Sequence, residues 1–189
     1  MQAAILAGER VTGVTVMKTE LALDAGDMLL VKRCPIEEGE TSGELSEKLS
    51  ALAADALCEA YDLISSDDEN LLLQDESAAT FCKKIKKEDA KVDFSAPADK
   101  VCALINAMSP SPAAFCMHGG KSVNLYRAFA EGDAEGVPGQ VIGVTKRGIT
   151  VRCGSGCARI TEAQFAGGKR LSAADILNGR KISVGDMLE

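Results

Sequence analysis

The chain has 189 residues, of which 46% are hydrophobic and 26% are charged, and its formal net charge is −7. These values are ordinary for a soluble globular protein of one or two domains, and no apolar run is long enough to span a membrane. The N-terminal residues lack the basic start and long apolar centre of a signal peptide, so we expect a cytoplasmic protein.

The acidic and basic residues are unevenly divided. Residues 1–80 carry 5 basic and 17 acidic side chains, a net charge of −12, whereas residues 81–189 carry 16 and 11, a net charge of +5. An acidic half joined to a basic half indicates two domains with different partners. A basic half is typical of a protein that binds a polyanion such as a nucleic acid.

The first predicted elements are short. Residues 1–6 read as the end of a helix that stops at Gly8. The β-branched run 11–17 predicts a strand, and a polar turn separates it from a second strand over 28–33. Two strands joined by such a turn form a hairpin, which we expect at the edge of a larger sheet.

The turn between these strands contains two carboxylates, Asp24 and Asp27, on either side of Gly26. Glycine would let the backbone approach whatever Asp24 touches, and the following strand would hold the carboxylate still. The residues alone also fit a plain alternative, in which the two aspartates only shape the turn.

The most regular element predicted in the chain is a helix over residues 44–64. A capping box, Thr41 to Glu44, precedes it. Apolar residues then recur every three or four positions for about six turns, which predicts an amphipathic helix. They are Leu45, Leu49, Leu52, Ala56, Leu57, Ala60 and Ile64. Two short strands would cover too little of this stripe, so we expect part of it to be exposed and the chain to be poorly soluble.

A mixed and basic stretch follows the helix. After a polar break, residues 71–74 predict a short extended piece, and four lysines then fall within five positions. They are Lys83, Lys84, Lys86 and Lys87. Such a cluster is either a solvated surface or a linker that contacts phosphates.

In the second half of the chain, one more helix is followed by segments in which apolar residues recur at every second position. A helix is predicted over 98–107, and two prolines follow it. Five strands are then expected at regular spacing, with glycine turns between several of them, which predicts a small barrel. Their ranges are 113–117, 122–130, 140–145, 149–153 and 157–163. A last helix is predicted over 173–178.

Two kinds of site are not expected. Of the seven cysteines only Cys153 and Cys157 lie close together, so we predict scattered buried thiols in a reducing compartment and no metal. His118 is the only histidine; it falls in a predicted hairpin turn with no acidic or thiol neighbour at catalytic spacing. We therefore interpret His118 as a surface residue. No phosphate-binding glycine motif is present.

Several stretches together resemble the methionyl-tRNA formyltransferase family over nearly the whole chain. In chain order they are residues 2–9, 12–17, 23–29, 74–80, 86–90 and 167–180. The resemblance implies an α/β remnant of a Rossmann-like formyltransferase domain followed by a C-terminal OB-like β-barrel domain. The expected parts are residues 1–68 of the catalytic domain, a basic linker over 69–92 and a tRNA-binding domain over 93–189.

The same resemblance implies the reaction and its site. The family moves a formyl group from 10-formyltetrahydrofolate to the amino group of methionyl initiator tRNA, without a metal and as a monomer. Asp24 matches the aspartate of the family's Asn–His–Asp trio, and Glu20, Leu21, Leu23 and Asp24 match the loop that lies against the folate. The residues expected to contact tRNA are Lys83, Lys84, Lys86, Lys87, Lys121, Lys169 and Arg170.

The chain departs from the family pattern in two places. No asparagine precedes Asn70 and no histidine precedes His118, so the upstream Asn-x-His segment of the family is not in this sequence. We therefore expect the chain to be inactive alone. Ser109 and Ser111 also stand where the family usually has Asn and Trp, which puts the packing of the first barrel corner in question.

Two other functions fit the sequence. The first is a stand-alone RNA-binding module in which the barrel and linker keep their affinity for tRNA without chemistry. The second is a related folate-dependent formyltransferase that acts on another substrate, such as an amino sugar. The linker and the long motif at 167–180 favour methionyl-tRNA over this second alternative.

Overall fold

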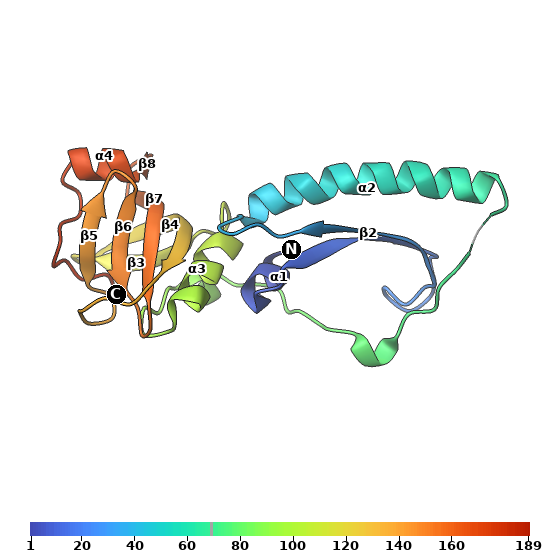
Figure 1. Ribbon diagram of the computed structural model, residues 1–189, viewed down its shortest axis with the longest axis horizontal. Coiled ribbons are helices and arrows are strands. Elements are labelled where there is room, and N and C mark those ends of the chain that lie inside the picture. Colours follow the sequence, from blue (N-terminus) through green and yellow to red (C-terminus); the bar gives the residue numbers. More distant parts are fainter. Residues whose placement is uncertain (69) are drawn as a thin grey trace. The chain divides into compact units, whose positions relative to one another are not determined.

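The computed structural model describes residues 1–68 and 70–189, so Glu69, where the predicted linker begins, lies outside the described residues (Figure 1). The chain divides into two compact units. The smaller unit comprises Glu9–Ile36 and Glu44–Lys84, and the larger unit comprises Met1–Gly8, Glu37–Gly43 and Ile85–Glu189. Within the described residues no helix is long and apolar enough to cross a membrane.

An antiparallel hairpin is the sheet of the smaller unit. Strand β1 (Val11–Met17) pairs with β2 (Met28–Pro35) from Val11 opposite Pro35 to Val16 opposite Leu30, and the register shifts at Met17. The predicted hairpin is confirmed, with β2 two residues longer than expected. Its expected place at the edge of a larger sheet is not, because within the described residues β1 and β2 form a two-stranded sheet of their own. Residues 18–27 form the connecting loop, which contains the predicted site.

Helix α2 (Ser42–Ser65) contains the predicted amphipathic helix and runs alongside β2 (Figure 1). Two polar contacts join them: Lys32 Nζ lies 2.8 Å from a Glu59 carboxylate oxygen, and Lys48 Nζ donates to the Pro35 carbonyl at 2.8 Å. Ala56 and Ala60 are buried, whereas Leu57, Tyr61 and Ile64 are 61%, 71% and 53% exposed. The expectation that part of the apolar stripe is exposed is therefore confirmed.

The larger unit is built on an antiparallel sheet with the order β3-β4-β7-β6-β5, and β8 pairs with β7. The strands are β3 (Ala114–His118), β4 (Lys121–Glu131), β5 (Val141–Thr145), β6 (Gly148–Arg152), β7 (Cys157–Phe165) and β8 (Arg170–Ser172). The five predicted strands are confirmed within a few residues. The short strand β8 was not predicted.

Helices cover the sheet of the larger unit. Helix α3 (Ala98–Ala107) packs on β4 and β7 and also contacts α1 (Gln2–Ala7). Helix α4 (Ala173–Asn178) begins at the predicted position with a capping box, in which the Ser172 and Asp175 side chains bond to each other's backbone N–H groups at 3.2 and 3.3 Å. Gly8, with φ of 79°, ends α1 as predicted.

The core of the larger unit lies between the sheet and α3. Its most buried large side chains include Ile105, Leu125, Ile149 and Ile160. Asn106 is buried among them, where it donates to the Ala128 carbonyl at 2.8 Å and accepts from the Ala128 N–H at 2.9 Å. The Asn106 amide thus provides hydrogen-bond partners for the Ala128 backbone, next to the shift in the β4–β7 register at Arg127.

The predicted barrel is not confirmed. Within the described residues the strand order is open, because β3 and β5 lie at its two ends and do not pair with each other. The C-terminal segment, residues 185–189, bonds to both ends instead. It exchanges backbone hydrogen bonds with Gly139 and Val141 at 2.8–2.9 Å and with Met117 at 2.6 and 2.9 Å.

Candidate functional site

The loop between β1 and β2, residues 18–27, contains the four residues expected to face the folate. Glu20, Leu21, Leu23 and Asp24 are all exposed, and the two leucines almost fully so. Asp24 has φ of 55°. Asp, Asn and Gly occupy this left-handed region at less cost than other residues, which explains an aspartate at this point of the loop. The exposed carboxylate is available to an external ligand.

The backbone of this loop is closed tightly at its base. The Lys18 N–H donates to the Asp27 carbonyl at 3.0 Å. A Cβ on buried Gly26 would lie 1.8 Å from the Lys18 carbonyl oxygen, so only glycine fits there. Asp27 therefore takes part in the turn through its backbone, while Asp24 projects from the part of the loop that is exposed.

A segment from beyond α2 also holds the loop. The Gln74 side-chain amide donates to the Asp24 carbonyl at 2.9 Å and to the Gly26 carbonyl at 2.6 Å. Leu72 and Met28 exchange two backbone hydrogen bonds of 2.8 Å, which bring Gln74 alongside the loop. Gln74 lies in residues 74–80, one of the stretches that resemble the family, but no sequence pattern assigns it a role.

This arrangement suits recognition of a planar heterocycle that carries N–H groups. Exposed Leu21 and Leu23 offer apolar surface, and the Asp24 carboxylate and nearby carbonyl groups accept hydrogen bonds. The described residues contain no group of three or more His, Cys, Asp or Glu side chains that could hold a metal ion. All seven cysteines are free, but only four of them are buried. Cys34 is half-buried and Cys58 and Cys82 are exposed, so the prediction of buried thiols is wrong at these three positions.

The four linker lysines are exposed, but the structure does not bring them into one unit. Lys83 and Lys84 end the smaller unit, while Lys86 and Lys87 belong to the larger one. The backbone N–H of Lys86 donates to an Asp89 carboxylate oxygen at 2.8 Å, next to the short 3-10 helix Glu88–Ala90.

The other predicted basic residues lie at one end of the sheet in the larger unit. Lys121 begins β4, and Lys169 and Arg170 follow the end of β7. The Ala166 N–H donates to the Ser122 carbonyl at 3.2 Å, which brings these two turns together. Beside them is a hollow of about 150 Å³ lined by Ser122, Asn124, Gln164, Phe165, Ala166 and Gly167.

Arg170 is already occupied by neighbours. Its Nε lies 2.6 Å from a Glu162 carboxylate oxygen, and its guanidinium lies 4.2 Å from the centre of the Tyr126 ring. Lys121 and Lys169 are exposed. At this end of the sheet the two lysines are thus better suited to contact a phosphate than Arg170.

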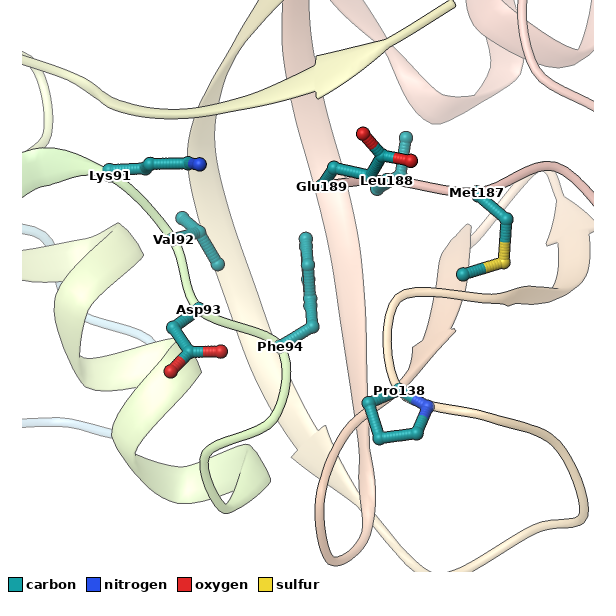
Figure 2. Close-up of a pocket in the computed structure, with 8 residues that line it drawn as sticks. All are labelled: Lys91, Val92, Asp93, Phe94, Pro138, Met187, Leu188 and Glu189. Atoms are coloured by element: carbon teal, nitrogen blue, oxygen red, sulfur yellow. The ribbon is translucent and has the colours of Figure 1, made fainter.

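A second hollow of about 340 Å³ lies apart from the predicted residues (Figure 2). Its lining includes buried Val92, Phe94 and Leu188 and charged Lys91, Asp93 and Glu189. Among these, the Asp93 carboxylate accepts from the Ser95 hydroxyl and backbone N–H at 2.7 and 2.9 Å, and these bonds lower the pKa of Asp93. The hollow forms where the chain entering the sheet passes the C-terminal segment.

His118 differs from the expectation. It is the last residue of β3 and half-buried, and its Nε2 lies 3.0 Å from a carboxylate oxygen of Asp186. Asp186 is distant from His118 in sequence, so the spacing of acidic residues around His118 did not predict this contact. This pair lies in the larger unit, whereas the Asp24 loop belongs to the smaller one.

Comparison with known proteins gives two family matches in chain order. The formyl transferase family model matches residues 1–61, and the model for the formyl transferase C-terminal domain matches residues 84–181. The solved structure of HypX from Aquifex aeolicus in complex with tetrahydrofolic acid is similar in fold. Its TM-score is 0.72 at 23% identity, and the match covers 97% of this chain and 33% of that one.

Curated relatives are more similar in sequence. The methionyl-tRNA formyltransferase of Stutzerimonas stutzeri (strain A1501) is 38% identical over 169 residues, which are 89% of this chain and 54% of that protein. The enzyme of the same name from Chromobacterium violaceum is 39% identical over 171 residues, with 90% and 54% covered. The chain spans about half the length of the curated relatives it matches.

Proposed function

We propose that this chain, which belongs to the formyl transferase family, carries part of the machinery that formylates methionyl initiator tRNA, as the names of its curated relatives suggest. The formyl donor would be 10-formyltetrahydrofolate, and the acceptor would be the methionyl amino group. The observation that carries this proposal is the match in chain order to both formyl transferase domains over most of the chain.

In this reaction the amine attacks the formyl carbon and a tetrahedral oxyanion forms and collapses. We assign the Asp24 carboxylate to orient the groups that exchange protons during these steps. Its exposure and the tight closure of its loop at Gly26 support this role. A carboxylate held on a fixed backbone loses little freedom when it engages the reacting groups.

We assign the folate to the same loop. The pterin ring is planar, and its N–H groups need acceptors. The backbone and side chains of Glu20, Leu21, Leu23 and Asp24 offer exposed apolar surface together with carbonyl and carboxylate oxygens. No metal takes part in the proposed chemistry.

We propose that the larger unit and the linker hold the tRNA. The chain from residue 81 onward has a net charge of +5, and Lys83, Lys84, Lys86, Lys87, Lys121 and Lys169 are exposed. Lysines of this kind bind phosphates through charge and position rather than base sequence. The protein would act as a monomer in the cytoplasm, where charged tRNA is used.

The 189 residues alone are proposed to be inactive. The family trio also needs an asparagine and a histidine upstream of Asp24, and the sequence has neither before that residue. Residues that act as one catalytic unit lose most of the activity when any one is missing. An RNA-binding module without chemistry remains a second candidate, and the same basic residues favour it.

Binding of labelled initiator tRNA to this chain tests the tRNA assignment. We expect an affinity that falls more than about tenfold between about 50 and 200 mM salt. The double variant Lys121→Ala/Lys169→Ala should reduce the slope of log affinity against log salt by about one to two. Lys100→Ala, which removes an exposed lysine of α3 outside the set, is the control and should leave the slope unchanged.

The outcome separates the candidates. If the chain folds but shows no salt-dependent affinity for tRNA, both the tRNA assignment and the binding-module alternative are wrong. If it binds tRNA but transfers no formyl group when the upstream residues of a relative are supplied, the binding module becomes the better description. A formyltransferase for an amino sugar would fail the tRNA assay and formylate the sugar instead.

A further inference from the structure

The side-chain amide of Gln74 is the centre of a small set of contacts around the Asp24 loop. Its nitrogen lies 2.9 Å from the Asp24 carbonyl oxygen, 2.6 Å from the Gly26 carbonyl oxygen and 3.6 Å from the Met17 sulfur. A primary amide nitrogen carries two N–H donors. Both can therefore be used on the two carbonyl groups, one on each side of Ala25.

This set of acceptors also fixes the orientation of the amide. The nitrogen and oxygen of a glutamine amide are assigned from their hydrogen-bond partners. Here both close partners are carbonyl oxygens, which can only accept, so the nitrogen must face the loop. The contact thus depends on a donor at position 74 and not only on a side chain of suitable shape.

The chain on both sides of Gln74 is built to place it there. Two 2.8 Å backbone hydrogen bonds pair Leu72 with Met28, the first residue of β2. Just after Gln74, the Asp75 carboxylate accepts from the Ser77 N–H at 3.0 Å and from its hydroxyl at 2.6 Å. The chain therefore turns away immediately after Gln74.

The loop conformation needs such support at the residues that Gln74 contacts. Asp24 has the left-handed φ of 55°, and Gly26 leaves no space for a side chain. A left-handed residue other than glycine costs free energy and persists where its surroundings impose it. The carbonyl groups of Asp24 and Gly26 accept from Gln74 in this conformation, so the amide stabilises it directly.

We propose that Gln74 is a positioning residue, which holds the backbone at Asp24 in the conformation that presents its carboxylate and the adjacent carbonyl groups to the folate. Only the folate part rests on the proposed function. The structural part, that the Gln74 donor fixes the loop, stands on the contacts within the smaller unit and can be tested without any ligand.

The decisive variant is Gln74→Glu in the full 189-residue chain. Glutamate keeps the shape of glutamine but, when ionised, has no donor and faces two carbonyl oxygens. At pH 7 we expect protection of the loop amides 18–27 against hydrogen exchange to fall about tenfold or more. Amides of the β1–β2 ladder serve as an internal reference for global unfolding.

The pH dependence of loop protection in Gln74→Glu separates the loss of the hydrogen-bond donor from a loss of side-chain shape. The ordinary pKa of a glutamate is about 4.3, so at lower pH the side chain of the variant gains one O–H donor. We expect loop protection, expressed relative to the unchanged protein at each pH, to recover in part below about pH 4. Gln2→Glu makes the same charge change in the larger unit and should leave the loop unchanged at every pH.

Titration with tetrahydrofolate, followed by calorimetry, completes the test. Weaker binding in Gln74→Glu, together with loss of loop protection, supports the whole proposal. Unchanged loop protection at pH 7, or no recovery in acid, overturns the positioning role. Loss of protection with unchanged tetrahydrofolate affinity keeps the structural part and overturns the folate part. If the unchanged chain shows no affinity for tetrahydrofolate, the proposed folate site fails independently of Gln74.

Discussion

The Nε2 atom of His118 lies 3.0 Å from a carboxylate oxygen of Asp186, although the two residues are 68 positions apart. The same Asp186 oxygen accepts from the Ser183 N–H at 2.8 Å. The pair therefore ties the end of β3 to the C-terminal segment 185–189. That segment also bonds through its backbone to Met117 of β3 and Val141 of β5, so it pairs with part of the edge strand at each end of the sheet.

Removing residues 185–189 should therefore cause self-association. The deletion exposes unpaired backbone groups on β3 and near β5, and open strand edges pair with other chains. It also removes Leu188, which is 2% exposed. We expect oligomers by light scattering after size-exclusion chromatography.

The control for this deletion is Leu188→Ala, which keeps the backbone pairing and loses only the buried side chain. We expect it to lower the free energy of unfolding by about 2–4 kcal/mol while the chain associates no more than the unchanged protein. If the deletion is no more associated than this variant, the C-terminal segment does not protect the sheet edges.

Asn106→Ala should destabilise the larger unit. The substitution leaves the Ala128 N–H and carbonyl without their partner inside the core. Each unsatisfied buried group costs about 1–3 kcal/mol, so we expect a loss of about 2–5 kcal/mol in urea unfolding. Asn178→Ala, at an exposed position near the end of α4, is the matched control. Equal stability of the two variants would contradict the role of Asn106 at the register shift.

The buried thiols should make the protein less stable at alkaline pH. Burial raises the pKa of Cys116 to about 12, whereas an unfolded thiol has a pKa near 9. Above about pH 9 the unfolded state loses this proton and the folded state keeps it. The unfolded state then binds fewer protons, so the free energy of unfolding falls as the pH rises toward 12.

Cys116→Ala isolates this contribution. In urea unfolding at several pH values between 9 and 11, we expect the slope of stability against pH to be shallower by about 1.4 kcal/mol per pH unit than in the unchanged protein. Cys82→Ala removes an exposed thiol and is the control. An identical slope in Cys116→Ala and the unchanged protein would mean that this thiol does not titrate differently on unfolding.

Sequence patterns predicted local structure well where the signal is local. The period-two runs gave the strands of the larger unit, and Ser172 with Asp175 marked the start of α4. The hairpin around Asp24 followed from β-branched runs on either side of a polar turn. In each case neighbouring residues determine the element.

Contacts between residues distant in sequence were not predictable in this way. No local spacing pairs Gln74 with Asp24 or His118 with Asp186. The short strand β8 has three residues and no periodicity of its own, and it forms because β7 offers an edge. The C-terminal segment likewise has no strand pattern, yet it bonds to both ends of the sheet and takes the place of the expected barrel closure.

The exposed apolar residues of α2 give a further prediction. Leu57, Tyr61 and Ile64 follow one another at helical spacing and are exposed. Because such a stripe favours association in water, Leu57→Glu/Ile64→Lys should shift sedimentation profiles at high concentration toward the monomer. The double variant Ser50→Glu/Ser65→Lys introduces the same two charges at exposed polar positions of the helix and is the control. If the profiles of both double variants match that of the unchanged chain, the stripe does not drive association.

Formylation of charged initiator tRNA tests the proposed catalytic role of Asp24. Three proteins are compared with 10-formyltetrahydrofolate: this chain, a fusion in which the upstream residues of the Stutzerimonas stutzeri relative precede residue 1, and the same fusion with Asp24→Ala. We expect no product from the chain alone, product from the fusion, and a rate lowered about 100-fold or more by Asp24→Ala. Formylation by the chain alone, or an Asp24→Ala fusion as active as its parent, would contradict the account.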